Sequence, residues 1–207
     1  MAALSATSRG GSPARRELRY LVGLRVLPRR VALFDWRAHR LASQLGDEFS
    51  LVSATRPPDL ALLLGLARGR RRVVELGTGT GWTALALALQ DPHREVVTYD
   101  PVYRAERERY LELVNPGVRA RITFVRSPGS SGPLSQDPVD LLYVDSAHGR
   151  RDTIEEIEAW RPVLAPDGLV ILDDFTHPDF PGVREAVQEL GLSGRQEGTL
   201  FVHATPP

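Results

Sequence analysis

The feature that most constrains the fold is an alternation of short strand-like runs with helical segments from residue 72 onward. We expect strands at 73–76, 96–99, 122–125, 141–144, 169–172 and 200–202. We expect helices between them at 82–89, 104–114, 153–164 and 183–190. Strands that alternate with helices pair in parallel through right-handed crossovers, so the sequence predicts an α/β fold with a doubly wound, mostly parallel sheet. Ligands of such sheets bind beyond the carboxyl ends of the strands.

The chain before residue 71 shows helical spacing without strands. Apolar residues recur at helical intervals over 30–45, and Pro57 opens a second helix at 59–67, since proline is tolerated in a first turn. We expect residues 17–70 to form an N-terminal helical cap. Residues 71–207 would form the cofactor-binding core of what is one domain overall.

Three local signals complete the expected elements. Thr153 and Glu156 have the spacing of a capping box at the start of the helix expected there. The last strands are compressed into 192–202, so a closing hairpin is only weakly indicated. Residues 1–16 are rich in Ala, Ser and Arg and contain no acid, which is typical of a disordered tail or of an organellar transit peptide. We favour the tail, because the arginine richness continues through the whole chain.

The composition excludes several classes of protein. Acidic and basic residues balance at 26 each, so no net field attracts nucleic acid or an anionic membrane. The absence of cysteine excludes disulfides, thiolate metal sites and cysteine nucleophiles. No apolar run approaches the length of a membrane span. We therefore expect a cytoplasmic protein whose partner is a small-molecule substrate, and the sequence leaves a homodimer open.

A glycine-rich loop follows the first expected strand, between Glu75 and Trp82. Glycines allow a sharp turn and a close approach of a ligand, and the helix that follows offers unpaired N–H groups. A dinucleotide site requires the spacing G-x-G-x-x-G, but position 82 is Trp. In addition, the Glu75 carboxylate would repel a diphosphate and suits a cation.

The loop resembles the first motif of the class I S-adenosylmethionine-dependent methyltransferases. That motif reads E-x-G-x-G-x-G, and Glu75, Gly77, Gly79 and Gly81 match it. The resemblance extends in element order over about residues 50–203, and it places the loop under the methionine part of the cofactor. The cofactor-binding residues it implies are Glu75, Gly77, Thr78, Gly79, Gly81, Trp82, Thr83, Asp100, Ser127 and Asp145.

Two of these residues follow later strands. Asp100 ends the second strand, and its carboxylate can accept both hydroxyls of a ribose, the role that the resemblance gives it. Ser127 follows the third strand, in the region that borders the adenine in the resembled family. The acidic residue common there is missing, so Ser127 can equally be an ordinary turn serine.

Carboxylates gather after the fourth and fifth strands. Asp145 ends the fourth strand, and Asp173 and Asp174 end the fifth, which is expected to lie beside it. Three unpaired carboxylates in one pocket repel one another, and a hard cation such as Mg²⁺ would relieve this. A bound cation would also lower the pKa of a substrate hydroxyl. His148, three residues after Asp145, is the candidate general base.

This cluster resembles the Mg²⁺-dependent small-molecule O-methyltransferases. The catechol-type enzymes have Asn where Asp174 stands and Lys where His148 stands, whereas the macrolide-sugar O-methyltransferases have a histidine at the latter place. The resemblance implies metal-assisted O-methylation of a small molecule. A plainer alternative is that Asp145 contacts only the cofactor, that Asp173 caps a turn and that His148 is a polar loop residue.

Three other functions remain open at this point. One is a methyltransferase that acts on nitrogen or carbon without a metal. Another is a nicotinamide-dependent oxidoreductase, which Glu75 and Trp82 argue against. The third is a non-catalytic cofactor-binding domain, for which an intact acid cluster would have no use.

Overall fold

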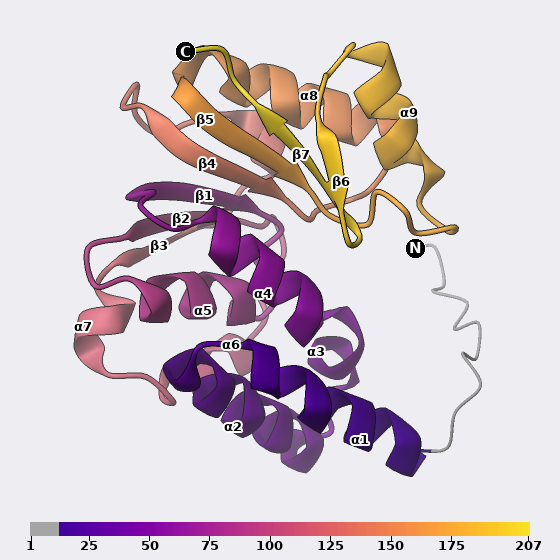
Figure 1. Cartoon of the computed structure of the whole chain (residues 1–207). Helices are drawn as coiled ribbons and strands as arrows, with labels where there is room; N and C mark the ends of the chain where they lie inside the picture. Colours follow the sequence, from indigo (N-terminus) through magenta and orange to yellow (C-terminus); the bar gives the residue numbers. More distant parts are fainter. Residues whose placement is uncertain (1–12) are drawn as a thin grey trace.

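The computed structural model describes residues 13–207, with side chains from residue 17 onward. Its strands are β1 Arg72–Leu76, β2 Glu95–Tyr99, β3 Ile122–Val125, β4 Val139–Val144, β5 Leu164–Leu172, β6 Arg195–Glu197 and β7 Leu200–Ala204. Within the described residues they form a seven-stranded sheet in the order β3-β2-β1-β4-β5-β7-β6 (Figure 1). Strands β1 to β5 run parallel, whereas β7 is antiparallel to β5 and β6. The predicted doubly wound, mostly parallel α/β sheet is confirmed.

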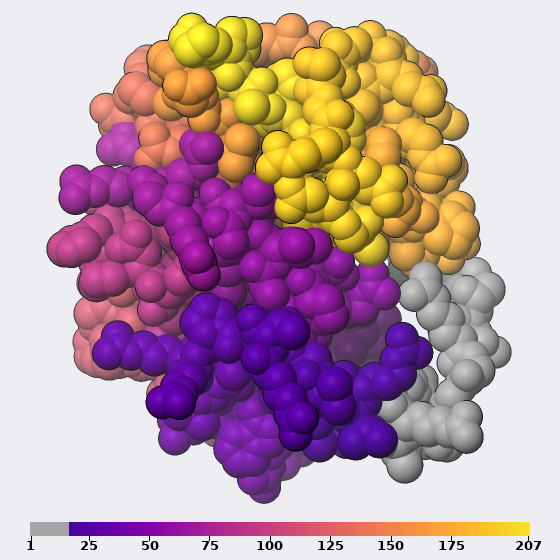
Figure 2. Space-filling view, in the orientation of Figure 1, coloured from indigo at the N-terminus to yellow at the C-terminus, as the bar shows by residue number. Residues whose placement is uncertain are grey.

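Helices cover both faces of the sheet. They are α1 Pro13–Gly23, α2 Arg29–Leu45, α3 Glu48–Ser53, α4 Pro57–Leu66, α5 Trp82–Gln90, α6 Glu106–Leu111, α7 Pro116–Arg119, α8 Arg150–Trp160 and α9 Pro181–Glu189. Helices α8 and α9 lie on one face and α4 and α5 on the other, with α1 and α2 as a further layer outside α4 and α5 (Figure 1). The space-filling view shows the N-terminal helices and the C-terminal strands in one continuous body (Figure 2). Among the helices of residues 13–207, none has both the length and the apolar character needed to cross a bilayer.

The sheet separates two hydrophobic cores. Side chains alternate along β1, so Val73 points into the core under α5 and Val74 into the core under α8. Phe34 of α2 extends the first core. Trp160 of α8 fills the second, and its indole N–H donates to the Gly129 carbonyl at 2.8 Å. Burial of each such large side chain contributes about 1.5–3 kcal/mol.

The N-terminal part of the chain differs from the predictions. Helix α1 begins at Pro13, so residues 13–16 of the expected tail are helical. Residues 1–12 lie outside the described residues. Helix α3 was not predicted, because its six residues are too few to show a periodic pattern. Its start is instead set by Asp47, whose side chain accepts a hydrogen bond from Ser50 N.

Two predicted helices have different ends. The helix expected at 153–164 runs from Arg150 to Trp160, because Leu164 already begins β5. The capping box is therefore wrong: Thr153 lies inside the helix, where its Oγ1 donates to a carbonyl, and Glu156 accepts from Ser146 Oγ. The helix expected at 104–114 is shorter and is followed by a second one, α7.

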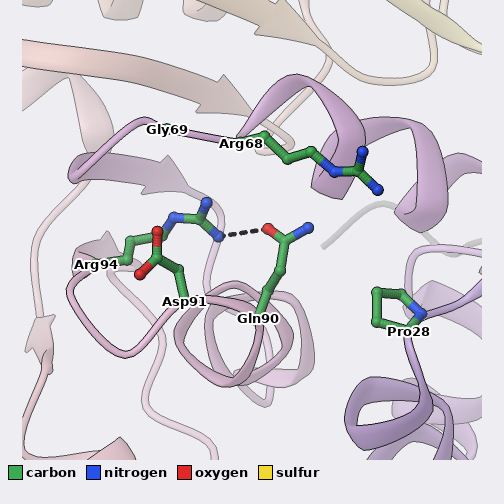
Figure 3. A pocket seen from close by; sticks show the side chains of 6 residues that line it. All are labelled: Pro28, Arg68, Gly69, Gln90, Asp91 and Arg94. Carbon is green, nitrogen blue, oxygen red and sulfur yellow. Dashed lines mark hydrogen bonds between the residues drawn. The ribbon is translucent and has the colours of Figure 1, made fainter.

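A cavity of about 260 Å³ lies at the amino ends of the strands, far from the expected ligand edge (Figure 3). It is lined by Pro28, Arg68, Gly69, Gln90, Asp91 and Arg94. Arg94 is fully buried, and its guanidinium donates to the carbonyls of Ala67 and Leu87 near the ends of α4 and α5. It also donates to Gln90 Oε1 at 2.7 Å (Figure 3). Arg94 therefore ties two helix ends together inside the protein.

The turn after β1 packs backbone against backbone. Gly77 has a φ of +102°, and a Cβ built on it would lie 1.9 Å from the carbonyl oxygen of Asp145. Only glycine can occupy this position, both because of its left-handed backbone and because of the contact. The turn after β1 is thus pressed against the end of β4.

Gly77→Ala should lower the free energy of unfolding by more than about 3 kcal/mol, because backbone overlap adds to the strain of a left-handed residue. Gly191→Ala is the matched control, since Gly191 has a φ of +61° and nothing within 4 Å of an added Cβ. The control should lose only about 1–2 kcal/mol. Urea denaturation of both variants measures the difference, and equal losses would contradict the close packing at Gly77.

Candidate active site

The glycine loop lies at the carboxyl edge of the sheet, between the ends of β2 and β4. Gly77 N donates to Tyr99 O at the end of β2 at 2.9 Å, and Asp145 N donates to Leu76 O at 2.8 Å on the other side. The loop then enters α5, whose N-cap is Gly81 with a φ of 86°. The sequence pattern of strand, glycine loop and helix is therefore present in the structure.

Glu75 lies beneath the loop. Its side chain is 1% exposed, and its Oε2 accepts a hydrogen bond from Thr98 Oγ1, which is also 2.6 Å from Thr78 Oγ1. Burial raises the pKa of Glu75 to about 8, although the hydrogen bond from Thr98 acts in the opposite direction. The side chain thus supports the loop from below, and direct contact of Glu75 with a cofactor stays a prediction.

Asp100 joins the end of β2 to the loop. Its Oδ2 accepts from Gly79 N at 2.9 Å, and its Oδ1 accepts from Val102 N at 2.7 Å. A carboxylate has further acceptor capacity beyond two amides, so hydroxyls can still bind it. Ser127 pairs locally, with its Oγ 2.7 Å from Ser131 Oγ.

Two further residues of the predicted set lie on α5. The indole of Trp82 is buried in the core, edge-on to Tyr110 with ring centroids 5.2 Å apart. Thr83 is also buried, and its Oγ1 lies 3.0 Å from Thr55 Oγ1. The Trp82 side chain therefore packs the helix, while Thr83 links the helix to the N-terminal part of the chain.

Sequence reasoning missed Arg107 of α6. This side chain is 7% exposed, and its Nη2 donates to Gly79 O at 2.9 Å. The guanidinium also lies 4.9 Å from the ring centroid of Phe124, and its charge acts on Asp100 and Glu75. Arg107 thus fixes the loop carbonyl and partly neutralises the acids around it. Its segment looks like a solvated charged helix in sequence, so no signal pointed to this role.

Helix α3 rests on the same loop. Phe49 is the nearest side chain to the position of an added Cβ on Gly79, at 3.4 Å. The Arg104 guanidinium lies 3.3 Å from the ring centroid of Phe49, and Ser50 Oγ lies 2.7 Å from Thr80 Oγ1. The N-terminal cap therefore reaches the candidate cofactor loop.

The predicted carboxylates do come together, but around a tyrosine. The Tyr143 hydroxyl donates to Asp173 Oδ2 at 2.6 Å and lies 3.4 Å from Asp145 Oδ2. Asp173 Oδ1 accepts from Asp174 N at 2.7 Å and from Thr199 Oγ1 at 3.2 Å. Burial, reinforced by the charges of Asp145 and Asp173, raises the pKa of Tyr143 well above its usual value, so the hydroxyl keeps its proton.

His148 lies beside this group. Its Nε2 is 3.2 Å from Asp145 Oδ1 and 3.6 Å from Asp174 Oδ2. Its ring stacks on Phe180, with centroids 4.6 Å apart. Burial lowers the pKa of His148, but the hydrogen bond and charge of Asp145 outweigh it, so the pKa is raised overall. The structure thus brings His148 to the cluster, and its role as a base stays a prediction. Phe180 is a contact that the sequence did not indicate.

The carboxylates do not fit the predicted metal site. Among the described residues, no three His, Cys, Asp or Glu side chains are placed so that they could hold a metal ion. The Tyr143 hydroxyl contacts one oxygen of Asp173 and one of Asp145, and the remaining oxygens contact Thr199 and His148 respectively. A Mg²⁺ site needs oxygen lone pairs converging at 2.0–2.1 Å in octahedral geometry. The predicted ligand set of Asp145, Asp173 and Asp174 is therefore not formed in this arrangement.

Comparison with known proteins agrees with the fold and the loop. Residues 74–175 match a family described as a methyltransferase domain. The structure is similar to the O-methyltransferase TomG of Streptomyces achromogenes, solved in complex with SAM (S-adenosylmethionine), with a TM-score of 0.59 and 25% identity over 81% of this chain and 89% of that one. The TDP-rhamnose 3′-O-methyltransferase CalS11 has the same fold at 18% identity, with a TM-score of 0.60 over 98% of this chain and 99% of that one.

Curated relatives also match by sequence. The O-methyltransferase ankF of Aspergillus thermomutatus is 29% identical over 122 residues, which are 57% of this chain and 51% of that protein. The ubiquinone/menaquinone biosynthesis C-methyltransferase UbiE of Syntrophotalea carbinolica is 28% identical over 116 residues, 55% of this chain and 47% of that protein. The chain spans about half the length of these relatives.

The glycine loop on this sheet, together with these matches, gives the chain the fold and the cofactor loop of the class I S-adenosylmethionine-dependent methyltransferases. More specifically, residues 74–175 match the family model described as a methyltransferase domain. The predicted cofactor class is confirmed, and the nicotinamide-dependent alternative is set aside. The donor set suits SAM, because Asp100 retains acceptor capacity for the hydroxyls of a ribose.

Glu75→Gln should change how the stability of the ligand-free protein depends on pH. The folded-state pKa of Glu75 is about 8 against an ordinary 4.5, so its stabilising contribution is complete below pH 4.5 and is lost as the pH rises to 8. The glutamine variant does not titrate. Its melting temperature should match the wild type near pH 5 and exceed it by at least about 5 °C near pH 8.

Glu158→Gln is the control for this experiment, because Glu158 is an exposed residue on α8. Thermal unfolding across the pH range should show the wild-type profile for this variant. If the melting temperatures of Glu75→Gln and the wild type differ by the same amount at every pH between 5 and 8, Glu75 is charged over that whole range and its pKa is not raised.

Proposed function

We propose that this chain transfers the methyl group of SAM to a hydroxyl group of a small molecule, with His148 as the general base. The observation that carries the proposal is the pairing of His148 with Asp145 at 3.2 Å, one strand away from the glycine loop. The base thus lies at the strand edge where the cofactor class binds its ligand.

The geometry supports proton removal by the imidazole. Nε2 faces Asp145 and Asp174, so a tautomer that donates from Nε2 leaves Nδ1 to accept the proton of the acceptor hydroxyl. The carboxylate of Asp145 would then stabilise the imidazolium that forms. Stacking on Phe180 restricts the ring orientation. When bound, SAM supplies a methyl group on a sulfonium, a reactive electrophile that requires only an oriented nucleophile.

The names of the relatives support oxygen as the accepting atom. TomG and ankF are both described as O-methyltransferases, and CalS11 as an enzyme that acts on a TDP-sugar. UbiE is a C-methyltransferase, so the domain alone does not dictate the accepting atom. A hydroxyl acceptor suits His148, because a hydroxyl loses its proton when it is methylated and a base must take that proton. A carbon acceptor that is already a carbanion has no proton to lose.

Divalent metal assistance, which the sequence predicted, is not part of this proposal. The carboxylates that would hold a cation are engaged by Tyr143, Thr199 and His148. The steps above therefore use only the side chains of the chain and the bound methyl donor.

The N-terminal cap would supply contacts to the acceptor. Thr55 Oγ1 lies 3.4 Å from the Tyr143 hydroxyl, and Arg56, the N-cap residue of α4, lies within electrostatic reach of Asp174. Phe49 covers the glycine loop from the same segment. Residues 47–56 thus border both halves of the site, and we propose that they select the acceptor.

His148→Gln should lower the turnover number by about 10²–10⁴, the usual contribution of a general base. Affinity for S-adenosylhomocysteine should stay within about twofold, since the glycine loop is untouched. The wild type is first screened with SAM against phenols, catechols and sugar alcohols, and mass spectrometry locates the added methyl group. The variant is then assayed on the acceptor found.

His93→Gln serves as the control, because His93 is exposed in the turn before β2, at the opposite edge of the sheet. It should retain wild-type turnover. A methyl group found on nitrogen or carbon, or a His148→Gln variant with wild-type turnover, would refute the proposal.

A further inference from the structure

Tyr143 lies in the candidate site, but the proposed reaction gives its side chain no role. It lies on β4 two residues before Asp145, and its ring is fully buried in the core under α5. Only its hydroxyl reaches the polar cluster. A tyrosine oxygen at the end of a rigid strand is held in place by the packing of the whole ring.

The hydroxyl oxygen has three polar neighbours. They are Asp173 Oδ2 at 2.6 Å, Asp145 Oδ2 at 3.4 Å and Thr55 Oγ1 at 3.4 Å. The hydroxyl has one proton, and the short distance shows that it is donated to Asp173. One neutral donor therefore lies between two carboxylates that belong to neighbouring strand ends.

The remaining oxygens of these carboxylates are also engaged. Thr199 Oγ1 and the amide of Asp174 donate to Asp173 Oδ1, and His148 contacts Asp145 Oδ1. Asp173 is 8% exposed, and Tyr143, Thr199 and the amide of Asp174 donate to it. A cation held by Asp145 Oδ2 and Asp173 Oδ2 would compete with the Tyr143 oxygen, which contacts both.

We propose that the Tyr143 hydroxyl takes the place of a divalent cation between Asp145 and Asp173 and so makes this site independent of metal. Its proton stabilises the Asp173 carboxylate, which a cation would otherwise do. Removal of that single oxygen should then open a cation site between the two carboxylates. This role of Tyr143 deepens the proposed function, because it concerns the same site, but cation binding can be measured without any methyl acceptor.

The test measures binding of Mn²⁺, which accepts the same oxygen ligands as Mg²⁺. Electron paramagnetic resonance of free Mn²⁺ gives the bound fraction in the wild type, Tyr143→Phe and the double variant Tyr143→Phe/Asp173→Asn. The wild type should show no binding tighter than about 1 mM. Tyr143→Phe should bind at least about tenfold more tightly than the wild type, and the double variant should lose that gain.

Thr199→Val is the matched control, because it removes a donor to Asp173 without vacating the place between the carboxylates. It should gain no Mn²⁺ affinity. Calorimetry with S-adenosylhomocysteine shows that each variant is folded. If Tyr143→Phe does not fold, the wild type and Asp173→Asn decide the question, because the proposed role requires that neither binds Mn²⁺ tightly.

Submillimolar Mn²⁺ binding by the wild type that Asp173→Asn abolishes would overturn the role of Tyr143, as would a folded Tyr143→Phe that binds no better than the wild type. Neither result would touch the proposed methyl transfer to a hydroxyl. Conversely, a methyl group found on nitrogen or carbon would refute that function and leave the Mn²⁺ result standing.

Discussion

The contact between the backbones of Gly77 and Asp145 holds the two halves of the site together. The turn after β1 lies so close to the end of β4 that no side chain fits between them. Asp145 N also donates to Leu76 O, which closes the gap between the two strands. As a result, the glycine loop that defines the methyltransferase class and the carboxylate that pairs with His148 lie at one edge of the sheet. The proposed reaction needs this adjacency, because the acceptor oxygen that gives its proton to His148 is the atom that receives the methyl group from SAM.

The second constraint is electrostatic. Glu75, Asp100, Asp145, Asp173 and Asp174 all lie near this edge, and each must be neutralised or hydrogen-bonded. Thr98 donates a hydrogen bond to Glu75, and Tyr143 donates one to Asp173. Backbone amides donate to Asp100, and the positive charge of Arg107 lies near both Glu75 and Asp100. The acid cluster is thereby stable as a hydrogen-bonded network. This is also why an acid cluster is not by itself a metal site.

The sequence predicts much of this fold, for physical reasons. Strands buried on both faces appear as short apolar runs. The glycine loop is recognisable because its sharp turn needs glycine, which tolerates a positive φ and a close approach of other atoms. Short elements escape prediction, as α3 shows, since six residues cannot display a helical period. The misplaced capping box has a different cause: Thr153 and Glu156 have the correct spacing, but the helix begins earlier, at Arg150.

The candidate site was predicted only in its outline. Asp145, Asp173, Asp174 and His148 do meet, because parallel strands bring their carboxyl ends to one edge. What the cluster contains besides them depends on side chains from distant segments. Tyr143 reads as one more apolar strand residue, and Arg107 as one more charge on a solvated helix. No local pattern in the sequence indicates that Tyr143 lies between two carboxylates or that Arg107 binds the glycine loop.

The most direct test of the whole account is a crystal structure of the protein grown with S-adenosylhomocysteine and MnCl₂. The account predicts the ligand over the Gly77–Gly81 loop, with its ribose hydroxyls on Asp100 and its sulfur facing His148. It also predicts no anomalous manganese peak between Asp145 and Asp173. A ligand bound elsewhere would contradict the assignment of the cofactor site, and a manganese ion between the two carboxylates would contradict the metal-independent arrangement around Tyr143.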